Sequence, residues 1–593
     1  MKLSFLNSLP TDPKDLATNG GIIIAMKPTV HAWLLRQNIA AQNTLPYFSN
    51  VSHESALLSS DAAAQWLRAE AKFLETTFGI EYAYREMFIF LTRFAIHYCL
   101  WVIDVVQHAI DRHQPTGLFA SCQSSRPAGS FYIESCENYL VKLVRIIAQQ
   151  RGIPFKIVRS EENSVSGKFR MAYSLLRGIL KSGHPMLATA RYKWLKKRFP
   201  KRKKILYTTT AYQMDLVIED LKSGFPNVDF ELLAESPLIP SRRLPPQWDA
   251  FQTFVAKLRQ NSPPFSYLGV PFGDLVAQKI EDNIAPYLVG YLRSTPFLDQ
   301  WLDLLEPAAV LTNANRADDK LLAELCRKKG IPNIVISHGS HISPKNDFER
   351  IEWGEHGKQF LSAPYSHIAL QSPIAEGYIG AYKPDALTLK TGPLIWGRKI
   401  KRVRDLPLDF GAEKIVLHAG TPKITSSLRF QIYETPDEYI QSLKDLSNVI
   451  LKMENVRLVI KFRPMEEISI ETLTTLLPDS PKITIETKQT FRDSLSRADL
   501  LVSFSSTTIE EALQNQIPVL LYGGNGRYQH IPAQRVKKGV PLSKSALYFA
   551  PDFSDLEFAV RGILALSPRF DEKIFEPYIY GESQRESLLG KIL

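Results

Sequence analysis

Residues 499–522 read DLLVSFSSTTIEEALQNQIPVLLY and decide the fold class of this chain. Leu500–Phe504 is a short apolar run, as expected for a buried parallel strand. Four hydroxyl residues follow it at the start of a helix pattern, and Ile517–Leu521 opens a second apolar run. A strand, a helix and a strand in this order predict a unit of parallel sheet.

Short β-rich runs alternate with longer helical patterns along the rest of the chain. This alternation predicts an α/β fold with two doubly wound domains that face a cleft, followed by a helical tail. We expect the domains at residues 1–400 and 401–554 and the tail, packed back on the first domain, at 555–593. The strands expected in the second domain are Ile415–Ala419, Val456–Phe462, Ile483–Glu486, Leu500–Phe504 and Val519–Tyr522.

The first domain is expected to contain more strands, with helical insertions between them such as Asp61–Thr77, Glu86–Arg112 and Asn138–Arg151. A charged, proline-containing stretch, Arg398–Phe410, is the expected linker to the second domain. The strands expected before the linker are Gly21–Ala25, Gly117–Ser121, Phe155–Val158, Ile205–Thr208, Asp229–Leu233, Ala309–Thr312, Ile334–Ser337, Ile368–Leu370 and a last one within Leu387–Pro393.

The composition is that of an ordinary globular protein with a basic surface. The 593 residues carry a formal charge of +11, which favours anionic partners such as nucleotides or an anionic membrane. The four cysteines make no C-x-x-C pair, so neither a zinc site nor a disulfide framework is expected. The N-terminus does not have the pattern of a signal peptide. The apolar segment Met87–Val106 has the length of a membrane span, but charged residues interrupt it, so we expect a buried helix.

Polar residues follow the expected strands, at the side of an open α/β sheet where ligands bind. His338 comes after Ile334–Ser337 and is a candidate general base, because histidine titrates near neutral pH. Asp318 and Asp319 follow the strand at Ala309–Thr312 and are candidate catalytic carboxylates. For either aspartate taken alone, capping of the next helix is a slightly better interpretation.

Candidate phosphate-binding residues follow three strands of the second domain. Gly420, Thr421 and Lys423 lie after the first strand, although Gly-Thr-Pro is also an ordinary turn. Lys461 and Arg463 share one face at a strand end, which suits a phosphate but also an exposed edge.

The hydroxyl turn of residues 499–522 supplies the other candidate ligands. Ser505, Ser506 and Thr507 can bond a phosphate or cap the helix, and Glu510 and Glu511 can reach a ribose hydroxyl. No D-x-D sequence and no P-loop occur, so neither a resident metal nor a cofactor is expected.

With these motifs in view, residues 310–533 resemble the GT-B glycosyltransferases, whose two domains are Rossmann-like. Ser505-Ser506 is similar to the Ser-Ser motif of bacterial sialyl- and Kdo-transferases of capsule and lipopolysaccharide assembly. Lys461-Phe-Arg463-Pro464 resembles a variant of their His-Pro motif, with Arg463 in the place of the histidine. Glu511 matches the ribose-binding glutamate of GT-B enzymes and of UDP-N-acetylglucosamine 2-epimerases.

The resemblance implies a metal-independent transferase that moves a sugar from a CMP-, UDP- or similar donor to a lipid-linked or other glycan of the bacterial surface. The first domain then binds the acceptor and the second binds the donor. A nucleotide-sugar 2-epimerase and a CDP-polyol phosphotransferase remain alternative enzymes. A basic scaffold on a membrane or on RNA is the non-enzymatic alternative, but no RNA-recognition signature is present, so no nucleic acid partner is expected.

A basic stretch suggests where the protein works. Nine of the fourteen residues from Arg191 to Lys204 are Lys or Arg, with Tyr192, Trp194, Leu195 and Phe199 between them. Upstream, apolar and basic residues of 168–181 have the pattern of an amphipathic helix. A solvated loop is the plainer interpretation. The aromatic residues favour docking on an anionic membrane, which predicts a peripheral protein on the cytoplasmic face.

Overall fold

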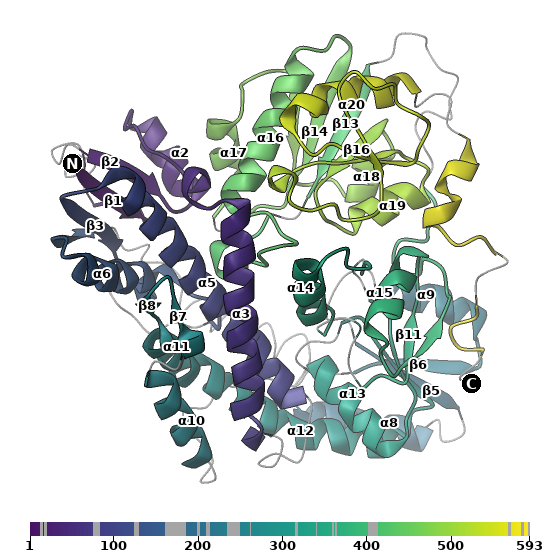
Figure 1. Cartoon of the computed structure of the whole chain (residues 1–593). Coiled ribbons are helices and arrows are strands. Elements are labelled where there is room, and N and C mark those ends of the chain that lie inside the picture. Colours follow the sequence, from purple (N-terminus) through teal and green to yellow (C-terminus); the bar gives the residue numbers. More distant parts are fainter. Residues whose placement is uncertain are drawn as a thin grey trace.

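The structure is a computed structural model. It describes residues 1–11, 16, 21–74, 83–123, 130–160, 185–198, 202–208, 214–233, 249–260, 263–314, 318–337, 339, 341–358, 361, 364–400, 413–420, 422–465, 467–566, 571–582, 586–590 and 593. These residues form three fully parallel sheets and one small hairpin, with helices packed around them (Figure 1).

The N-terminal sheet has the strand order β2-β1-β3-β4. Its strands are β1 (Lys2–Leu6), β2 (Gly21–Ala25), β3 (Gly117–Cys122) and β4 (Phe155–Arg159). The central strand β1 is buried over Leu3–Leu6 and pairs with both β2 and β3. The residues before 401, which were expected as one domain, therefore contain two separate parallel sheets.

The middle sheet has the order β12-β11-β10-β9-β5-β6. The order reverses between β5 and β9, so this sheet is doubly wound. Its strands are β5 (Lys203–Tyr207), β6 (Val228–Leu232), β9 (Ala309–Thr312), β10 (Asn333–Val335), β11 (His367–Ala369) and β12 (Leu387–Leu389).

The C-terminal sheet has the order β15-β14-β13-β16-β17-β19-β18. Apart from the two-residue edge strand β18, this is the 3-2-1-4-5-6 order of a Rossmann sheet, with its switch point between β13 and β16. The expected fold class, with two doubly wound domains, is confirmed. The strands are β13 (Lys414–Ala419), β14 (Val456–Lys461), β15 (Ile483–Glu486), β16 (Leu500–Ser503), β17 (Val519–Leu521), β18 (Gln534–Arg535) and β19 (Leu547–Phe549).

Helices cover the sheets and fill the space between them. The N-terminal part contributes α2 (Pro28–Arg36), α3 (Asn50–Glu70), α5 (Ala83–His113) and α6 (Tyr139–Arg151). The middle part contributes α8 (Pro185–Arg198), α9 (Met214–Gly224), α10 (Asp249–Arg259), α11 (Gly273–Lys279), α12 (Ala285–Leu305), α13 (Asp318–Lys329), α14 (Asp347–Gly357) and α15 (Ile374–Tyr382). The C-terminal part contributes α16 (Pro436–Leu451), α17 (Ile470–Leu476), α18 (Phe491–Leu495), α19 (Thr508–Gln514) and α20 (Phe553–Leu566).

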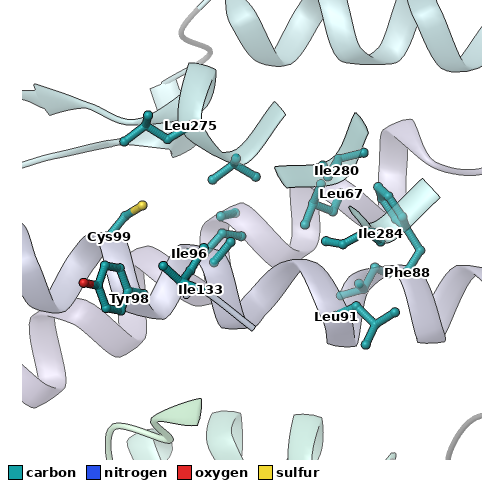
Figure 2. Close-up of a cluster of buried hydrophobic side chains, with 14 of the residues drawn as sticks. Leu67, Phe88, Leu91, Ile96, Tyr98, Cys99, Ile133, Leu275, Ile280 and Ile284 are labelled. Atoms are coloured by element: carbon teal, nitrogen blue, oxygen red, sulfur yellow. The ribbon is translucent and has the colours of Figure 1, made fainter. Parts of the chain in front are cut away.

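Helix α5 runs through the centre of the largest hydrophobic core. By length and composition it could cross a membrane, but 94% of its most apolar window is buried inside the protein, as expected for a buried helix. Figure 2 shows Phe88 and Leu91 of α5 near Leu67 of α3 and Ile284, and Ile96 of α5 beside Ile133. Burial of apolar side chains on this scale is the main stabilising term of the fold.

Buried polar contacts at the start of α16 join the N-terminal part to the C-terminal part. Arg527 Nη1 lies 2.6 Å from the Glu438 carboxylate at the start of α16, and His53 of α3 lies 3.3 Å from the same carboxylate. The Thr44 hydroxyl donates to Asp437 over 2.6 Å. Figure 1 shows α2 and the upper end of α3 beside α16 and α17. The N-terminal and C-terminal parts therefore pack directly on each other.

The end of the chain returns to the middle sheet. Helix α20 packs on α16 inside the C-terminal core. Beyond it, the Tyr580 hydroxyl donates to Glu376 of α15 over 2.6 Å. Leu588 and Leu589 lie in the hydrophobic cluster of the middle sheet.

Candidate functional site

Helices α15 and α19, which follow strands β11 and β16, lie next to each other where the middle and C-terminal parts meet (Figure 1). The Ser372 hydroxyl, which follows β11, donates to the Glu510 carboxylate of α19 over 2.6 Å. Trp353 Nε1 of α14 donates to the Tyr528 hydroxyl over 3.0 Å. Both contacts join segments that leave the carboxyl ends of strands. Doubly wound sheets bind ligands at this side, so the junction is the candidate site.

The hydroxyl turn after β16 fixes the loop that leaves β13. The Ser505 hydroxyl donates to the carbonyl of Ile432 over 3.0 Å, and the Thr508 hydroxyl donates to the carbonyl of Ala419 over 3.3 Å. Ser506 Oγ accepts from the Thr508 N–H over 3.3 Å, which closes a local turn. Thr507 is the N-cap of α19 but makes no side-chain capping bond. These hydroxyls therefore bring the loops of the two switch-point strands together.

The other candidate phosphate ligands lie at the same edge with different surroundings. Lys461 Nζ donates to the carbonyls of Glu486 and Thr487 over 3.4 Å each, toward β15, and burial lowers its pKa. Arg463 is exposed. Gly420 is half-buried, and a side chain there would meet the Tyr439 ring. Its Cα is therefore enclosed by protein.

The two glutamates of α19 have different roles. Glu510 accepts the Ser372 hydroxyl and joins the two sheets. Glu511 is buried, and its Oε1 atom has no hydrogen-bond partner among the described residues. Burial raises the pKa of Glu511 to about 7, against an opposing effect of Arg492. Glu511 thus retains an acceptor oxygen and titrates near neutral pH.

The structure tests the expected bases only in part. His338, Thr421 and the side chain of Asp318 lie outside the described residues. Asp319 is described and is fully buried near the start of α13. The catalytic roles of these residues stay predictions.

A cavity of about 280 Å³ opens beside the loop that leaves β13. Its larger wall is aromatic and apolar. Met87, Phe90, Leu91 and Phe94 line it from α5, at the i, i+3, i+4 and i+7 spacing of one helix face. Phe131 and Tyr132, from the segment after β3, and Tyr287 and Tyr291, from α12, continue this wall.

The facing wall of the cavity is polar and cationic. Lys423 Nζ lies 3.9 Å from the centre of the Tyr433 ring, and both residues belong to the loop between β13 and α16. Arg429 lies over Phe94 with its guanidinium carbon 4.7 Å from the ring centre. His356 of α14 completes this wall, with Nε2 3.4 Å from the Tyr433 hydroxyl. All three parts of the chain therefore contribute to the cavity.

A network of buried charged side chains lies next to the cavity. Arg93 Nη2 lies 3.1 Å from Glu352, and Arg429 Nε lies 3.7 Å from the same carboxylate. Burial raises the pKa of Glu352, and the two guanidinium groups oppose this effect. Nearby, the guanidinium groups of Arg93 and Arg68 and the Lys358 ammonium hold the pKa of Glu355 well below its usual range. The network fixes Arg429 relative to α5 and α14.

Sequence reasoning missed most residues of the cavity. Phe94 and Tyr291 have the spacing of core residues, and nothing local marks them as binding residues. His356 does not follow a strand directly, so the rule that selected His338 passed over it. Arg429 lies well beyond the expected Gly420–Lys423 turn. Lys423, Arg429 and Tyr433 all belong to the loop between β13 and α16, so considering the whole loop instead of its first few residues would have found them.

Comparison with known proteins yields structural likenesses only. No protein-family model and no curated protein matches the chain. One similar solved structure is the UDP-GlcNAc 2-epimerase of Methanocaldococcus jannaschii in complex with UDP-GlcNAc and UDP, at 12% identity and TM-score 0.36, covering 63% of this chain and 97% of that one. The UDP-GlcNAc 2-epimerase of Neisseria meningitidis bound to UDP-GlcNAc follows at 13% identity and TM-score 0.33, with coverages of 54% and 82%.

A third similar structure is the wall teichoic acid polymerase TagF, at 12% identity and TM-score 0.33, with coverages of 68% and 91%. All of these TM-scores are low. The fold of this protein is therefore established by its own strand order.

Proposed function

We propose that this protein is a glycosyltransferase of GT-B type that uses a nucleotide-sugar donor and a glycan acceptor. One observation carries the proposal. The loop that leaves β13, at the switch point of a Rossmann sheet, lines a cavity whose far side is built by other parts of the chain. The switch point is where such sheets bind nucleotides. A second substrate can then enter from the far side.

The charges at the junction fit the chemistry of glycosyl transfer. When an acceptor hydroxyl attacks the sugar, the bond to the nucleotide breaks and negative charge grows on the departing phosphate. Lys461 and Arg463, at the end of β14, can stabilise that charge. A base must take the hydroxyl proton. His338, Asp318 and Asp319 were expected for this role, and the cavity adds His356.

A nucleotide panel tests the proposal directly. CMP, CDP, UDP and GDP are each added to the full chain, and the melting temperature is measured. A ligand at a hundred times its Kd stabilises the folded state by about 2.7 kcal/mol. We expect one of the four to raise the melting temperature clearly. Product analysis of the matching nucleotide-sugar then separates a transferase, which needs an acceptor, from an epimerase, which does not.

We predict that Glu511 binds the donor ribose. A hydroxyl that donates to a charged group contributes about 1.5–3 kcal/mol, so Glu511→Gln should weaken nucleotide binding by about 10- to 100-fold at pH 8. Because the pKa of Glu511 is about 7, its ionised fraction rises between pH 6 and 8. Wild-type affinity should therefore rise with pH over that window and the variant should not show this rise. Calorimetry measures both.

Glu434→Gln is the matched control for this experiment. Burial also raises the pKa of Glu434 to about 7, but its Oε1 already accepts the Ser442 hydroxyl over 2.6 Å. The control should keep the affinity and its pH dependence. Equal affinity of the Glu511→Gln variant and the wild type at pH 8 would leave Glu511 as a purely structural residue.

We also propose that α8 docks the protein on an anionic membrane at the cytoplasmic face. The helix buries Ala188 and Tyr192 against α12, while Leu187 and Trp194 are 67% and 51% exposed. Leu187 and Trp194 are seven residues apart and share one face of the helix. Lys193 and Lys197 are exposed beside Trp194. The amphipathic pattern expected upstream, at residues 168–181, lies outside the described residues.

Vesicle co-sedimentation checks this docking. Each basic residue near an anionic surface contributes about 1 kcal/mol, so Lys193→Gln with Lys197→Gln should weaken binding roughly thirtyfold. Binding should also fade at high salt. The exposed pair Lys537 and Lys538 provides the control, since their change to Gln removes the same charge elsewhere. Equal binding to neutral and anionic vesicles would reject the docking surface.

A further inference from the structure

The aromatic wall of the cavity presents ring faces rather than a uniform aliphatic lining. The Phe94 and Phe131 rings are stacked with centroids 5.9 Å apart, and Tyr132 lies 4.8 Å from Phe94. Phe131 meets Tyr287 edge to face at 5.6 Å. Each ring is held by its neighbours. The wall is therefore preformed for a flat apolar surface such as one face of a sugar ring.

Hydroxyl groups are distributed among these rings. Tyr132, Tyr287, Tyr291, Tyr433 and Ser427 all line the cavity and each carries a hydroxyl that can donate or accept a hydrogen bond. A hydroxyl that already has one partner can still form a further hydrogen bond, which a hydrocarbon chain cannot supply. A saccharide can match them with its own hydroxyl groups. The lining therefore favours a sugar over a lipid tail.

The positive charge of the cavity lining favours a negatively charged sugar. Lys423 and Arg429 line the cavity, and none of the described residues that line it is acidic. Arg429 is balanced by Glu352, which lies outside the lining. Lys423 is held over the Tyr433 ring, which is a favourable position for a cation but does not neutralise its charge. The cavity thus offers positive charge to its occupant.

The size of the cavity limits the occupant. A volume of about 280 Å³ is just below the range of roughly 300–1,000 Å³ that is usual for small-molecule sites. Such a space suits one terminal unit of a chain. Most of its wall comes from α5, α12 and the segment after β3, and only the loop at 423–433 belongs to the C-terminal part. These positions place the occupant on the side opposite the expected donor.

We infer that the cavity binds the terminal unit of the acceptor, and that this unit is an anionic saccharide carrying a carboxylate or a phosphate. The aromatic wall holds the sugar, and Lys423 holds its charge. The identification of the occupant as the acceptor rests on the proposed function. The recognition of an anionic sugar by these residues stands on the lining alone.

Saturation-transfer NMR on the full chain, without nucleotide, tests the inference. The probes are glucuronic acid, N-acetylneuraminic acid and glucose 6-phosphate, each compared with glucose and N-acetylglucosamine as neutral sugars. We expect signals from at least one anionic sugar and none, or at least tenfold weaker binding, for the neutral ones. Lys423→Gln should remove the preference for the anionic sugar, and Lys423→Arg should retain it.

Matched variants show that the effect belongs to the cavity. Lys390→Gln removes another lysine that lies over a tyrosine ring, 5.9 Å from the centre of Tyr580 and outside the cavity, and should change nothing. Phe131→Ala should weaken anionic and neutral sugars alike, because it removes a ring face and no charge. Binding of anionic sugars that survives both Lys423→Gln and Phe131→Ala would overturn the inference.

The remaining outcomes separate this inference from the proposed function. Nucleotide binding without any binding of the anionic sugars would overturn the inference and leave the transferase in place. Anionic sugar binding without any nucleotide binding would support the saccharide cavity and remove the transferase. Displacement of the sugar by the bound nucleotide would place the cavity on the donor side and overturn the assignment to the acceptor.

Discussion

An Arg93→Met variant is expected to lose about 3–5 kcal/mol of unfolding free energy, because it leaves the Glu352 carboxylate buried without its nearer partner. Arg93 and Glu352 are almost completely buried and 3.1 Å apart. After the substitution Arg429, at 3.7 Å, is the one remaining cationic partner of Glu352 among the described residues. Methionine roughly preserves the length of the side chain, so lost packing is kept small. Urea denaturation measures the difference through the midpoint at constant slope.

Two controls define this result. Arg457→Met removes an exposed partner of Glu413 in an ion pair of 3.0 Å, and should cost less than about 1 kcal/mol. The conservative variant Arg93→Lys keeps a positive charge beside Glu352 and should recover much of the loss. A single variant that is destabilised no more than the Arg457→Met control would show that water reaches the pair in solution.

The Arg93–Glu352–Arg429 network also explains how the cavity is assembled. Arg93 belongs to α5, Glu352 to α14, and Arg429 to the loop between β13 and α16. One carboxylate therefore joins three parts of the chain that are far apart in sequence. Because Phe94 follows Arg93 on α5 and lies under Arg429, the same contacts position the aromatic and cationic walls of the cavity.

The strands of the C-terminal sheet could be predicted because they are continuous apolar runs between turn residues. Expected Ile415–Ala419 corresponds to β13, Leu500–Phe504 to β16 and Val519–Tyr522 to β17. A strand buried on both faces must be apolar throughout, and this requirement marks the sequence directly. Strand β19 was missed. It is as short and apolar as β17, but no α-helix separates it from β17 in the sequence to mark a strand–helix–strand unit.

The separate N-terminal sheet could not be predicted, for a different reason. Its strands β2, β3 and β4 were expected, but nothing in a short run says which sheet it joins. The central strand β1 was not expected, because Lys2 and Ser4 interrupt its apolar residues. Membership in a sheet is a tertiary property, decided by packing of helices such as α5 that lie far away in sequence.

Some residues of the candidate site could be predicted from the sequence and others could not. Residues that directly follow strands, such as Ser505 and Lys423, could be nominated because a strand end fixes their position at one edge of the sheet. Phe94, Tyr291 and His356 come from helices, and only the packing of those helices brings them to the cavity. Local patterns contain no information on that packing.

A His356→Gln variant is expected to lower kcat by about 10²–10⁴-fold, the usual contribution of a general base. His356 borders the cavity next to Lys423, with its Nε2 atom 3.4 Å from the Tyr433 hydroxyl, which orients the ring. A base on this wall reaches an acceptor held against the aromatic rings. Because the donor is bound by other residues, nucleotide affinity should change little. Initial rates and calorimetry on the same preparations separate the two effects.

The pH profile distinguishes a base at His356 from a structural histidine. Wild-type kcat should fall at low pH as the base takes up a proton. This fall, the acidic limb of the pH profile, should disappear in the His356→Gln variant. His367→Gln is the control, since His367 lies on β11 away from the cavity lining. A His338→Ala variant, measured beside it, tests the base expected from the sequence. If it loses the acidic limb while His356→Gln retains it, the base is His338 and His356 only shapes the cavity.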